Sequence, residues 1–268
     1  MFSRTILSDK KSEKIATHQR LVRAARRKLQ DYLPENQVFP LAKEINHFEG
    51  KNGPDGLLSK HNVADEPHQF IDPKHPDGEL LGYIRNHLYN LHEAYQHNDR
   101  VKMAFEAAWG EHMIVDGLTP AHQQPFKEQL RELDPRDLAE TNSVLKRIFM
   151  PGDSLKEYFI KNWKKIGPKG LGTNHILFEA GIDFITMPLS PKKLIPDLEQ
   201  SEVEAAKQGN FTELYIAAIH KIAGYKMFER YVAEGWTTDL AEDVRAKLLP
   251  EAVKMVTLGW IQGIFYGD

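Results

Sequence analysis

Apolar residues recur along most of this chain at intervals of three and four, the spacing that places side chains on one face of an α-helix. Runs that alternate apolar and polar residues, as half-buried strands do, are nearly absent. The pattern therefore predicts an all-α fold. We expect helices over about 12–32, 77–96, 100–116, 173–186, 191–208, 211–233 and 238–268, the last with a break at Pro250.

The same pattern predicts where the chain leaves regular structure. Asp77 and Asp99 can cap two of the helices, because a side-chain oxygen at this position accepts from a free backbone N–H. Residues 48–77 are rich in glycine and proline, and 120–172 indicate short helices and loops. There is no internal repeat or flexible linker. We therefore expect a single compact multi-helix domain over residues 1–268.

Composition narrows the classes of function. The 268 residues are 41% hydrophobic, enough for a sizeable core, and the net charge of −3 argues against a general electrostatic hold on nucleic acid or anionic membranes. The chain has no cysteine, so any metal must be held by His, Asp and Glu. No apolar run is long enough to span a bilayer, and no signal peptide is visible. A cytoplasmic protein is expected unless a leader has been removed.

One short segment concentrates residues that ligate metals. His112 and Asp116 stand four residues apart at the end of a predicted helix, so they project from one face. Gly117 is expected to end this helix, and Thr119–Pro120 to turn the chain so that His122 returns towards that face. The alternative is a helix end with a capping aspartate and two surface histidines.

Two further candidates lie elsewhere in the chain. His175 and Glu179 repeat the four-residue spacing within an apolar stretch, which favours a buried role, although a surface ion pair has the same spacing. His18 lies on the apolar face of the first predicted helix, where a core histidine is the alternative. Imidazole and carboxylate together suit zinc, and more than four such ligands imply more than one ion.

These motifs, taken in order, resemble the zinc-dependent phospholipase C family. That family includes the bacillus enzymes, clostridial alpha-toxin and, more distantly, the single-strand-specific nucleases of fungi and plants. The block from His112 to His122 is the most specific match, and the matches span nearly the whole chain. The matching segments are 17–24, Pro54-Asp55, 68–73, 112–122, His175-x3-Glu179 and the C-terminal 256–268.

The resemblance implies a helical domain that binds two or three zinc ions. In the family, one aspartate is shared between two of the ions, and Asp116 would be its counterpart. The implied ligands fall into three sets: the loop aspartate with His68, His112 and Asp116; Asp116 again with His18; and His122 with His175 and Glu179.

The loop aspartate has two candidates. Asp55 follows proline and precedes His68 by a distance like that in the family, whereas Asp65 is nearer and can chelate as Asp-x-x-His. Aspartate beside glycine or proline is also typical of plain turns. We favour Asp55, which the resemblance also makes the candidate catalytic residue, orienting a water molecule or accepting its proton.

The chain departs from the family at three points. The family uses the N-terminus of a first-residue tryptophan as a zinc ligand, and no tryptophan precedes Trp109 here. The segment before His175 carries an insertion over about 123–172. No counterpart of the choline-recognition residues is evident. The lysines of the insertion, which contact either phosphate or solvent, are Lys161, Lys164, Lys165 and Lys169.

Three hypotheses about function follow. The first is a zinc-dependent phosphodiester hydrolase, phospholipase C-like, acting on a phospholipid or related phosphate ester. The alternative is a zinc-dependent nuclease, which uses the same metal chemistry on nucleic acid. The third is a non-catalytic helical protein that keeps a structural metal site, and the missing N-terminal ligand supports it.

Overall fold

The computed structural model describes residues 16–35, 38–49, 52–54, 70–123, 129, 132–133, 150–167 and 170–266. Within these ranges the regular structure is helical, and the sole β-type pairing is an isolated bridge between Asp72 and His75. The all-α prediction is confirmed. The helices are α1 (Thr17–Leu29), α2 (Ala42–Ile45), α4 (Glu79–Gln96), α5 (Arg100–Leu118), η3 (Pro120–His122), α8 (Leu155–Ile166), α9 (Leu171–Thr186), η4 (Pro191–Leu194), α10 (Gln200–Lys207), α11 (Phe211–Gly224), α12 (Met227–Glu234), α13 (Thr238–Asp243), η5 (Val244–Leu248) and α14 (Leu249–Phe265).

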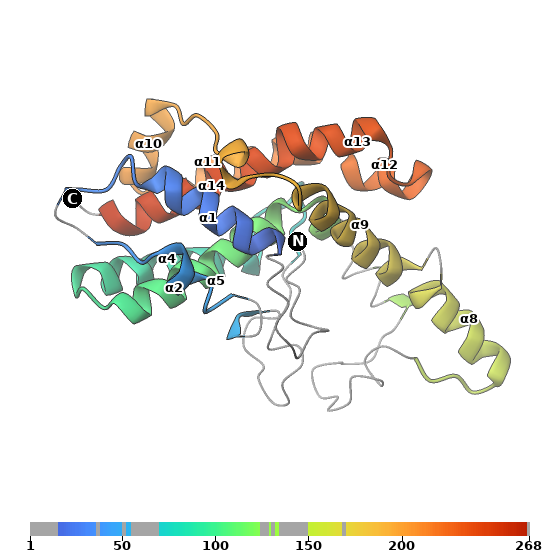
Figure 1. The fold of residues 1–268 in the computed structure, drawn as a ribbon. Helices are drawn as coiled ribbons and strands as arrows, with labels where there is room; N and C mark the ends of the chain where they lie inside the picture. Colours follow the sequence, from blue (N-terminus) through green and yellow to red (C-terminus); the bar gives the residue numbers. More distant parts are fainter. Residues whose placement is uncertain are drawn as a thin grey trace.

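Two helices, α5 and α14, are buried along most of their length and lie at the centre of the molecule (Figure 1). They contact each other, and α14 also packs against α1, α4, α10 and α11. Trp260 of α14 is fully buried and donates its indole N–H to the carbonyl of Ala107 in α5 at 3.1 Å. A helix that is apolar on every side must be enclosed in this way.

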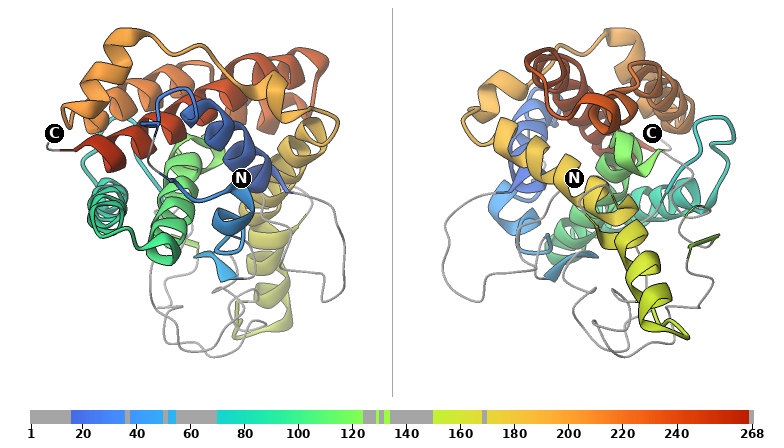
Figure 2. Two further views of the ribbon diagram at one scale, coloured as in Figure 1. Left: turned by 60° about the vertical axis from the view of Figure 1, so that its left-hand side comes forward. Right: turned by 90° about the vertical axis from the view of Figure 1, so that its right-hand side faces the viewer.

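Most of the other helices pack around this centre and form the body of the molecule, from which α8 and α9 extend as an arm. Helices α10 and α11 pack against α14, α4 packs against both α14 and α5, and α2 packs against α5 (Figure 1). Helices α8 and α9 follow one another and lead away from this body in every view (Figure 2). Nothing in the described chain is both long and apolar enough to serve as a membrane-crossing helix.

Several expected boundaries were wrong, each for a local reason. The helix expected over 211–233 is two, α11 and α12, because Lys226 adopts a left-handed conformation with φ of 50°. The helix expected over 191–208 is regular only from Gln200, after the short 3₁₀ turn η4. The break expected at Pro250 lies just before it, as the π-helical η5. Proline has no backbone N–H to donate to a carbonyl of the preceding turn, and its ring crowds that carbonyl.

The end of α5 corrects another expectation. Gly117 does not stop the helix, which continues to Leu118. The helix ends at Thr119, whose ψ of 120° is extended, because the following Pro120 disfavours helical geometry in the residue before it. Gly117 is required for packing instead: a Cβ there would overlap the Tyr215 hydroxyl and Leu80.

The two predicted N-caps have opposite outcomes. Asp99 caps α5 by accepting a hydrogen bond from the backbone N–H of Lys102 at 3.0 Å, as expected. Asp77 does not cap α4, because that helix begins at Glu79 and the capping position belongs to Gly78.

Candidate metal centre

Helix α5 brings three ionisable side chains into the core within two turns. Glu111, His112 and Asp116 are at most 1% exposed, although charged groups are seldom buried so completely without a partner. The 3₁₀ turn η3 then places His122 beside them, also fully buried. The backbone N–H of Ile71 donates to the carbonyl of His122 at 3.0 Å, which fixes this turn to the neighbouring segment.

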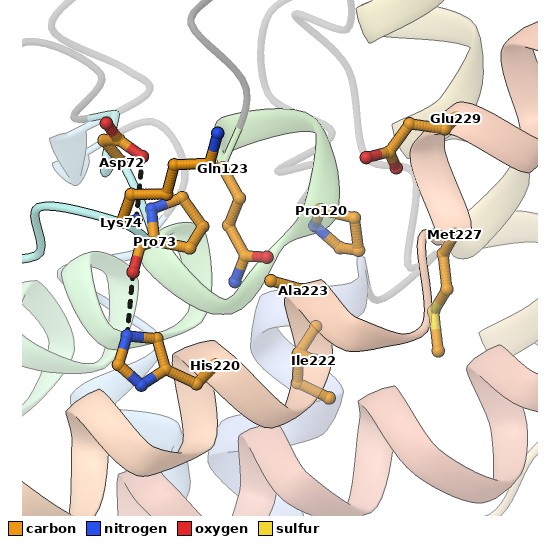
Figure 3. Close-up of a pocket in the computed structure, with 10 residues that line it drawn as sticks. All are labelled: Asp72, Pro73, Lys74, Pro120, Gln123, His220, Ile222, Ala223, Met227 and Glu229. Carbon is orange, nitrogen blue, oxygen red and sulfur yellow. Dashed lines mark hydrogen bonds between the residues drawn. The ribbon is translucent and has the colours of Figure 1, made fainter.

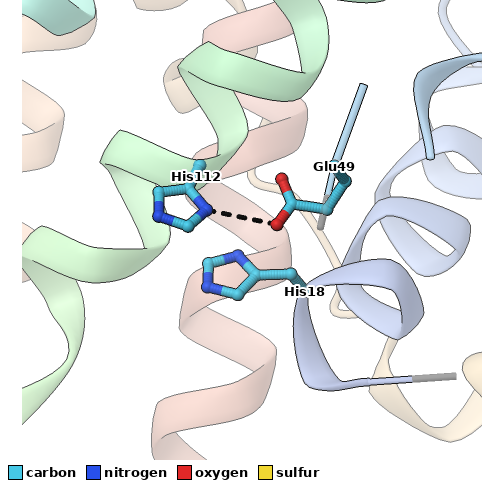
Figure 4. Close-up of side chains that lie close together, drawn as sticks. All are labelled: His18, Glu49 and His112. Carbon is cyan, nitrogen blue, oxygen red and sulfur yellow. Dashed lines mark hydrogen bonds and ion pairs between the residues drawn. The ribbon is translucent and has the colours of Figure 1, made fainter. Parts of the chain in front are cut away.

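Three residues from different parts of the chain meet at the start of this cluster, and we call His18, Glu49 and His112 the inner group. The rings of His18 and His112 are stacked, with centroids 4.4 Å apart and planes 11° from parallel. The Nδ1 atom of His112 lies 3.2 Å from an oxygen of Glu49 (Figure 4). One ligand atom from each residue lies within 4.8 Å of the others, which is close enough to hold one metal ion.

A second set of three, which we call the outer group, consists of His122, His175 and Glu179. The Nε2 atoms of His122 and His175 lie 2.9 Å and 3.6 Å from the same oxygen of Glu179. These three residues also place one ligand atom each within 4.8 Å of the others. Phe70 stacks on the ring of His122, with centroids 5.1 Å apart, and so closes one side of the group.

Asp116 lies between the two groups. One of its oxygens is 3.5 Å from His18 Nε2, and the other is 3.3 Å from His112 Nε2. The second oxygen also lies 3.8 Å from His122 Nδ1, in the outer group. A carboxylate that offers its two oxygens to different imidazoles has the geometry expected of a ligand shared between ions.

The electrostatics of the cluster favour bound positive charge. Although burial opposes protonation of His18, the charge of the neighbouring Glu111 and the hydrogen bond that the imidazole donates to Asp116 raise its pKa to about 10. Burial would raise the pKa of the Asp116 carboxyl, yet positive charge nearby, including that of His122 and His112, holds it well below its usual range. The pKa of Glu179 is likewise lowered, against the effect of burial, by positive charge nearby that includes His122. At His18 the neighbouring carboxylates therefore outweigh the cost of burying a positive charge.

Glu111 differs from the other carboxylates in the cluster. Burial raises its pKa to about 7, although the nearby His18 acts to lower it. Its two oxygens lie 3.3 Å and 3.4 Å from Nδ1 of His18, on the opposite side of the ring from Asp116. A carboxylate in that position can orient the imidazole and fix which nitrogen carries the proton.

The structure brings together six of the predicted ligands. They are His18, His112, Asp116, His122, His175 and Glu179. The remaining candidates, Asp55, Asp65 and His68, lie outside the described residues. The choice between Asp55 and Asp65, and the catalytic role of Asp55, therefore stay predictions.

Sequence reasoning missed Glu49 and Glu111. Glu49 follows the short helix α2, and the Asn46 side chain ties this segment to α1 by donating to the Gln19 carbonyl at 3.4 Å. No spacing in the sequence links Glu49 to His112, which is 63 positions away. For Glu111 a signal existed: it is a charged residue that directly precedes the candidate ligand His112 in a mostly apolar part of α5.

A cavity of about 590 Å³ lies on another side of η3. Pro120 and Gln123 form one wall, facing Met227 of α12, and His220 donates its ring N–H to the carbonyl of Pro73 at 2.7 Å (Figure 3). None of the six candidate ligands that the structure describes lines this cavity. It is therefore a feature separate from the metal centre.

Comparison of the chain with protein-family models, with curated proteins and with solved structures found no match in any of the three. The case for function therefore comes from the residues of the cluster. The donor set is imidazole nitrogen and carboxylate oxygen without sulfur, a combination that suits zinc and other divalent ions.

Proposed function

We propose that this protein is a zinc-dependent phosphodiester hydrolase of the phospholipase C type. The observation that carries the proposal is the position of Asp116, whose two oxygens face histidines of both groups. A purely structural zinc site is closed by four ligands around one ion. Two adjacent three-residue groups joined by a shared carboxylate are instead what a cluster of ions requires.

The inner group with Asp116 would hold one or two ions, and the outer group another. Zinc in such a cluster supplies Lewis-acid chemistry: it neutralises phosphate charge and makes a water molecule nucleophilic near neutral pH. The carboxylates of Asp116 and Glu179 are ready for this role because their lowered pKa values keep them ionised. His18 must release a proton to bind an ion, so zinc has to displace a proton held with a pKa of about 10.

The outer group is the better candidate for contact with substrate. His175 keeps 12% of its side-chain surface exposed, whereas His18 and His112 are enclosed by α1 and α5. The phosphate of a substrate would approach from this more accessible edge. The resemblance in sequence makes a phospholipid the expected substrate, and a nucleic acid the alternative.

The first experiment measures zinc per chain by plasma mass spectrometry on protein purified without chelator. We expect two or three zinc ions in the unchanged protein and fewer in His112→Ala. His97→Ala is the matched control, because His97 is an exposed histidine whose ring bonds to the Glu93 carbonyl of its own helix. The same preparations are then assayed on phosphatidylcholine in mixed micelles and on single-stranded DNA.

Each outcome separates the hypotheses. Hydrolysis of the phospholipid that is lost with zinc in His112→Ala supports the proposal. Cleavage of DNA without phospholipid hydrolysis would establish the nuclease alternative. A single tightly held ion with neither activity would indicate a structural site, and the absence of zinc after reconstitution would overturn the metal-dependent function.

A further inference from the structure

The arm formed by α8 and α9 exposes large apolar side chains that a globular protein usually encloses. Trp163 of α8 is 67% exposed and Phe184 of α9 is 74% exposed. Ile160, Ile176 and Leu177 on the same two helices are also exposed. All five belong to α8 or α9, the two helices that form this arm (Figure 1).

On α8 the exposed apolar residues alternate with lysines along one helical face. Lys156, Ile160 and Lys164 are spaced four apart, and Trp163 lies beside them, three residues after Ile160. The buried Asn162 faces the other way and bonds to the backbone of residue 150, which fixes this orientation of the helix. Within the described chain, neither Lys156 nor Lys164 forms an ion pair, whereas Lys161 pairs with Glu157 at 2.6 Å.

On α9 the exposed strip carries no charge. Ile176, Leu177 and Phe184 lie within about 100° of one another around this helix. Glu179, on the buried side of the same helix, lies about 60° around the axis from Ile176, and His175 immediately precedes Ile176 in the chain. The apolar strip is therefore next to the outer group, on the helix that supplies two of its three candidate ligands.

We propose that the exposed face of α8 and the apolar strip of α9 dock on the surface of an anionic phospholipid bilayer. Tryptophan and lysine on one helical face are the residues that anchor a helix at the boundary between headgroups and acyl chains. The unpaired lysines complement anionic headgroups. Docking itself requires no zinc. The inference rests on the proposed function in one respect: docking would present a membrane phosphodiester to the outer group.

Charge and shape favour the bilayer over other occupants. In a symmetric dimer the lysine face of one copy would meet the same lysines of the other, which is repulsive. Trp163 and Phe184 are rings on which nucleic-acid bases can stack, but the strip on α9 carries no cationic side chain to hold a nucleic-acid backbone. An acyl-chain boundary accommodates both the aliphatic residues and the exposed tryptophan.

The test uses the full chain and sonicated vesicles of phosphatidylcholine alone or with about 30% phosphatidylserine. Co-sedimentation measures binding, and tryptophan fluorescence reports its location. Trp163 is the one largely exposed tryptophan of the four, since Trp109 and Trp260 are buried and Trp236 is partly buried. We expect binding to the anionic vesicles with a blue shift of emission, and binding that weakens as salt is raised.

Matched variants assign the binding to this face. We expect the double variant Trp163→Ser/Phe184→Ser to lose affinity for anionic vesicles by about tenfold or more, because two large apolar side chains no longer insert. The control is Tyr89→Ser/Val101→Ser, which removes two equally exposed apolar side chains from α4 and α5. Lys156→Gln/Lys164→Gln should reduce the preference for anionic over neutral vesicles, and Lys43→Gln/Lys102→Gln should leave it unchanged.

The proposal is overturned if the unchanged protein binds neither vesicle, or if the arm variant binds as well as the control. It is also overturned if the arm variant abolishes self-association or binding to single-stranded DNA while vesicle binding is absent. All measurements are repeated after treatment with chelator. Vesicle binding that survives the removal of zinc keeps this inference separate from the proposed catalytic function.

Discussion

The inner and outer groups contain the same kinds of side chain in different surroundings. The inner group is enclosed between α1, α5 and the segment after α2, and each of its members is at most 3% exposed. The outer group lies where η3 meets α9, and its His175 reaches solvent. Under the proposed function, we expect the inner group to hold an ion permanently and the outer group to exchange contacts with substrate.

The strongest test of this comparison is Asp116→Asn, because Asp116 joins the two groups. We expect zinc content to fall and hydrolysis to drop by at least about a hundredfold, since an amide is a poor metal ligand. Plasma mass spectrometry and a phosphodiester assay measure the two effects. Asp183→Asn is the control: Asp183 is also buried, but it accepts a hydrogen bond from the Thr17 hydroxyl outside both groups. Equal losses in both variants would contradict the shared role.

The next test concerns the inner group alone. Glu111→Gln should weaken zinc binding by about ten- to hundredfold, because the amide no longer orients His18 as an anionic acceptor. Competition with a chromogenic chelator measures the affinity. Glu106→Gln is closely matched, since Glu106 lies on the same helix and bonds to a buried histidine, His87, at 2.7 Å. If the two variants bind zinc equally well, Glu111 has no positioning role.

A substitution at Gly117 tests the packing between the inner and outer groups and leaves every candidate ligand unchanged. Gly117→Ala should destabilise the fold by about 1–3 kcal/mol, because the new Cβ overlaps Tyr215 and Leu80 between Asp116 and η3. Gly82→Ala in α4 meets no atom within 4 Å and should instead stabilise by up to about 1 kcal/mol, because alanine favours helix. Urea denaturation of the metal-free proteins measures both. Similar urea midpoints for the two variants would show that the segment between Asp116 and η3 is not tightly packed.

The smallest expected effect is a pH dependence of the metal-free protein. The pKa of His18 in the fold is about 10, above its ordinary value of 6.5, so its contribution to stability is fully present below pH 6.5 and is lost as pH rises towards 10. The free energy of unfolding should therefore fall over this range, and less steeply in His18→Gln. Urea titrations at several pH values measure the slopes, and identical slopes would exclude a protonated inner group.

The sequence predicted the parts of this centre that repeat along a helix. His112 with Asp116 and His175 with Glu179 are one helical turn apart, so periodicity alone places each pair on one face. Most helices were also predicted from their apolar periodicity. Lys226 escaped prediction because its conformation, with φ of 50°, is one that a residue other than glycine seldom adopts.

Contacts between distant segments could not be predicted from the sequence. Glu49 and Glu111 join the cluster only because α1, α2 and α5 pack together. His87, which has no spacing typical of a ligand, is buried by its pairing with Glu106 in the adjacent helix. Spacing along the sequence shows which side chains share a helical face. Whether a single carboxylate is buried depends instead on which other segments of the chain pack over it.

The packing of α1 against α14 has a consequence for how the protein is made. The helix that carries His18 is synthesised early, but the helix that covers it emerges more than 200 residues later. Contacts so distant in sequence form late in folding, because a long loop must close first. The three residues of the inner group can therefore meet before α14 has been made, but α1 gains its full packing only after α14 has emerged.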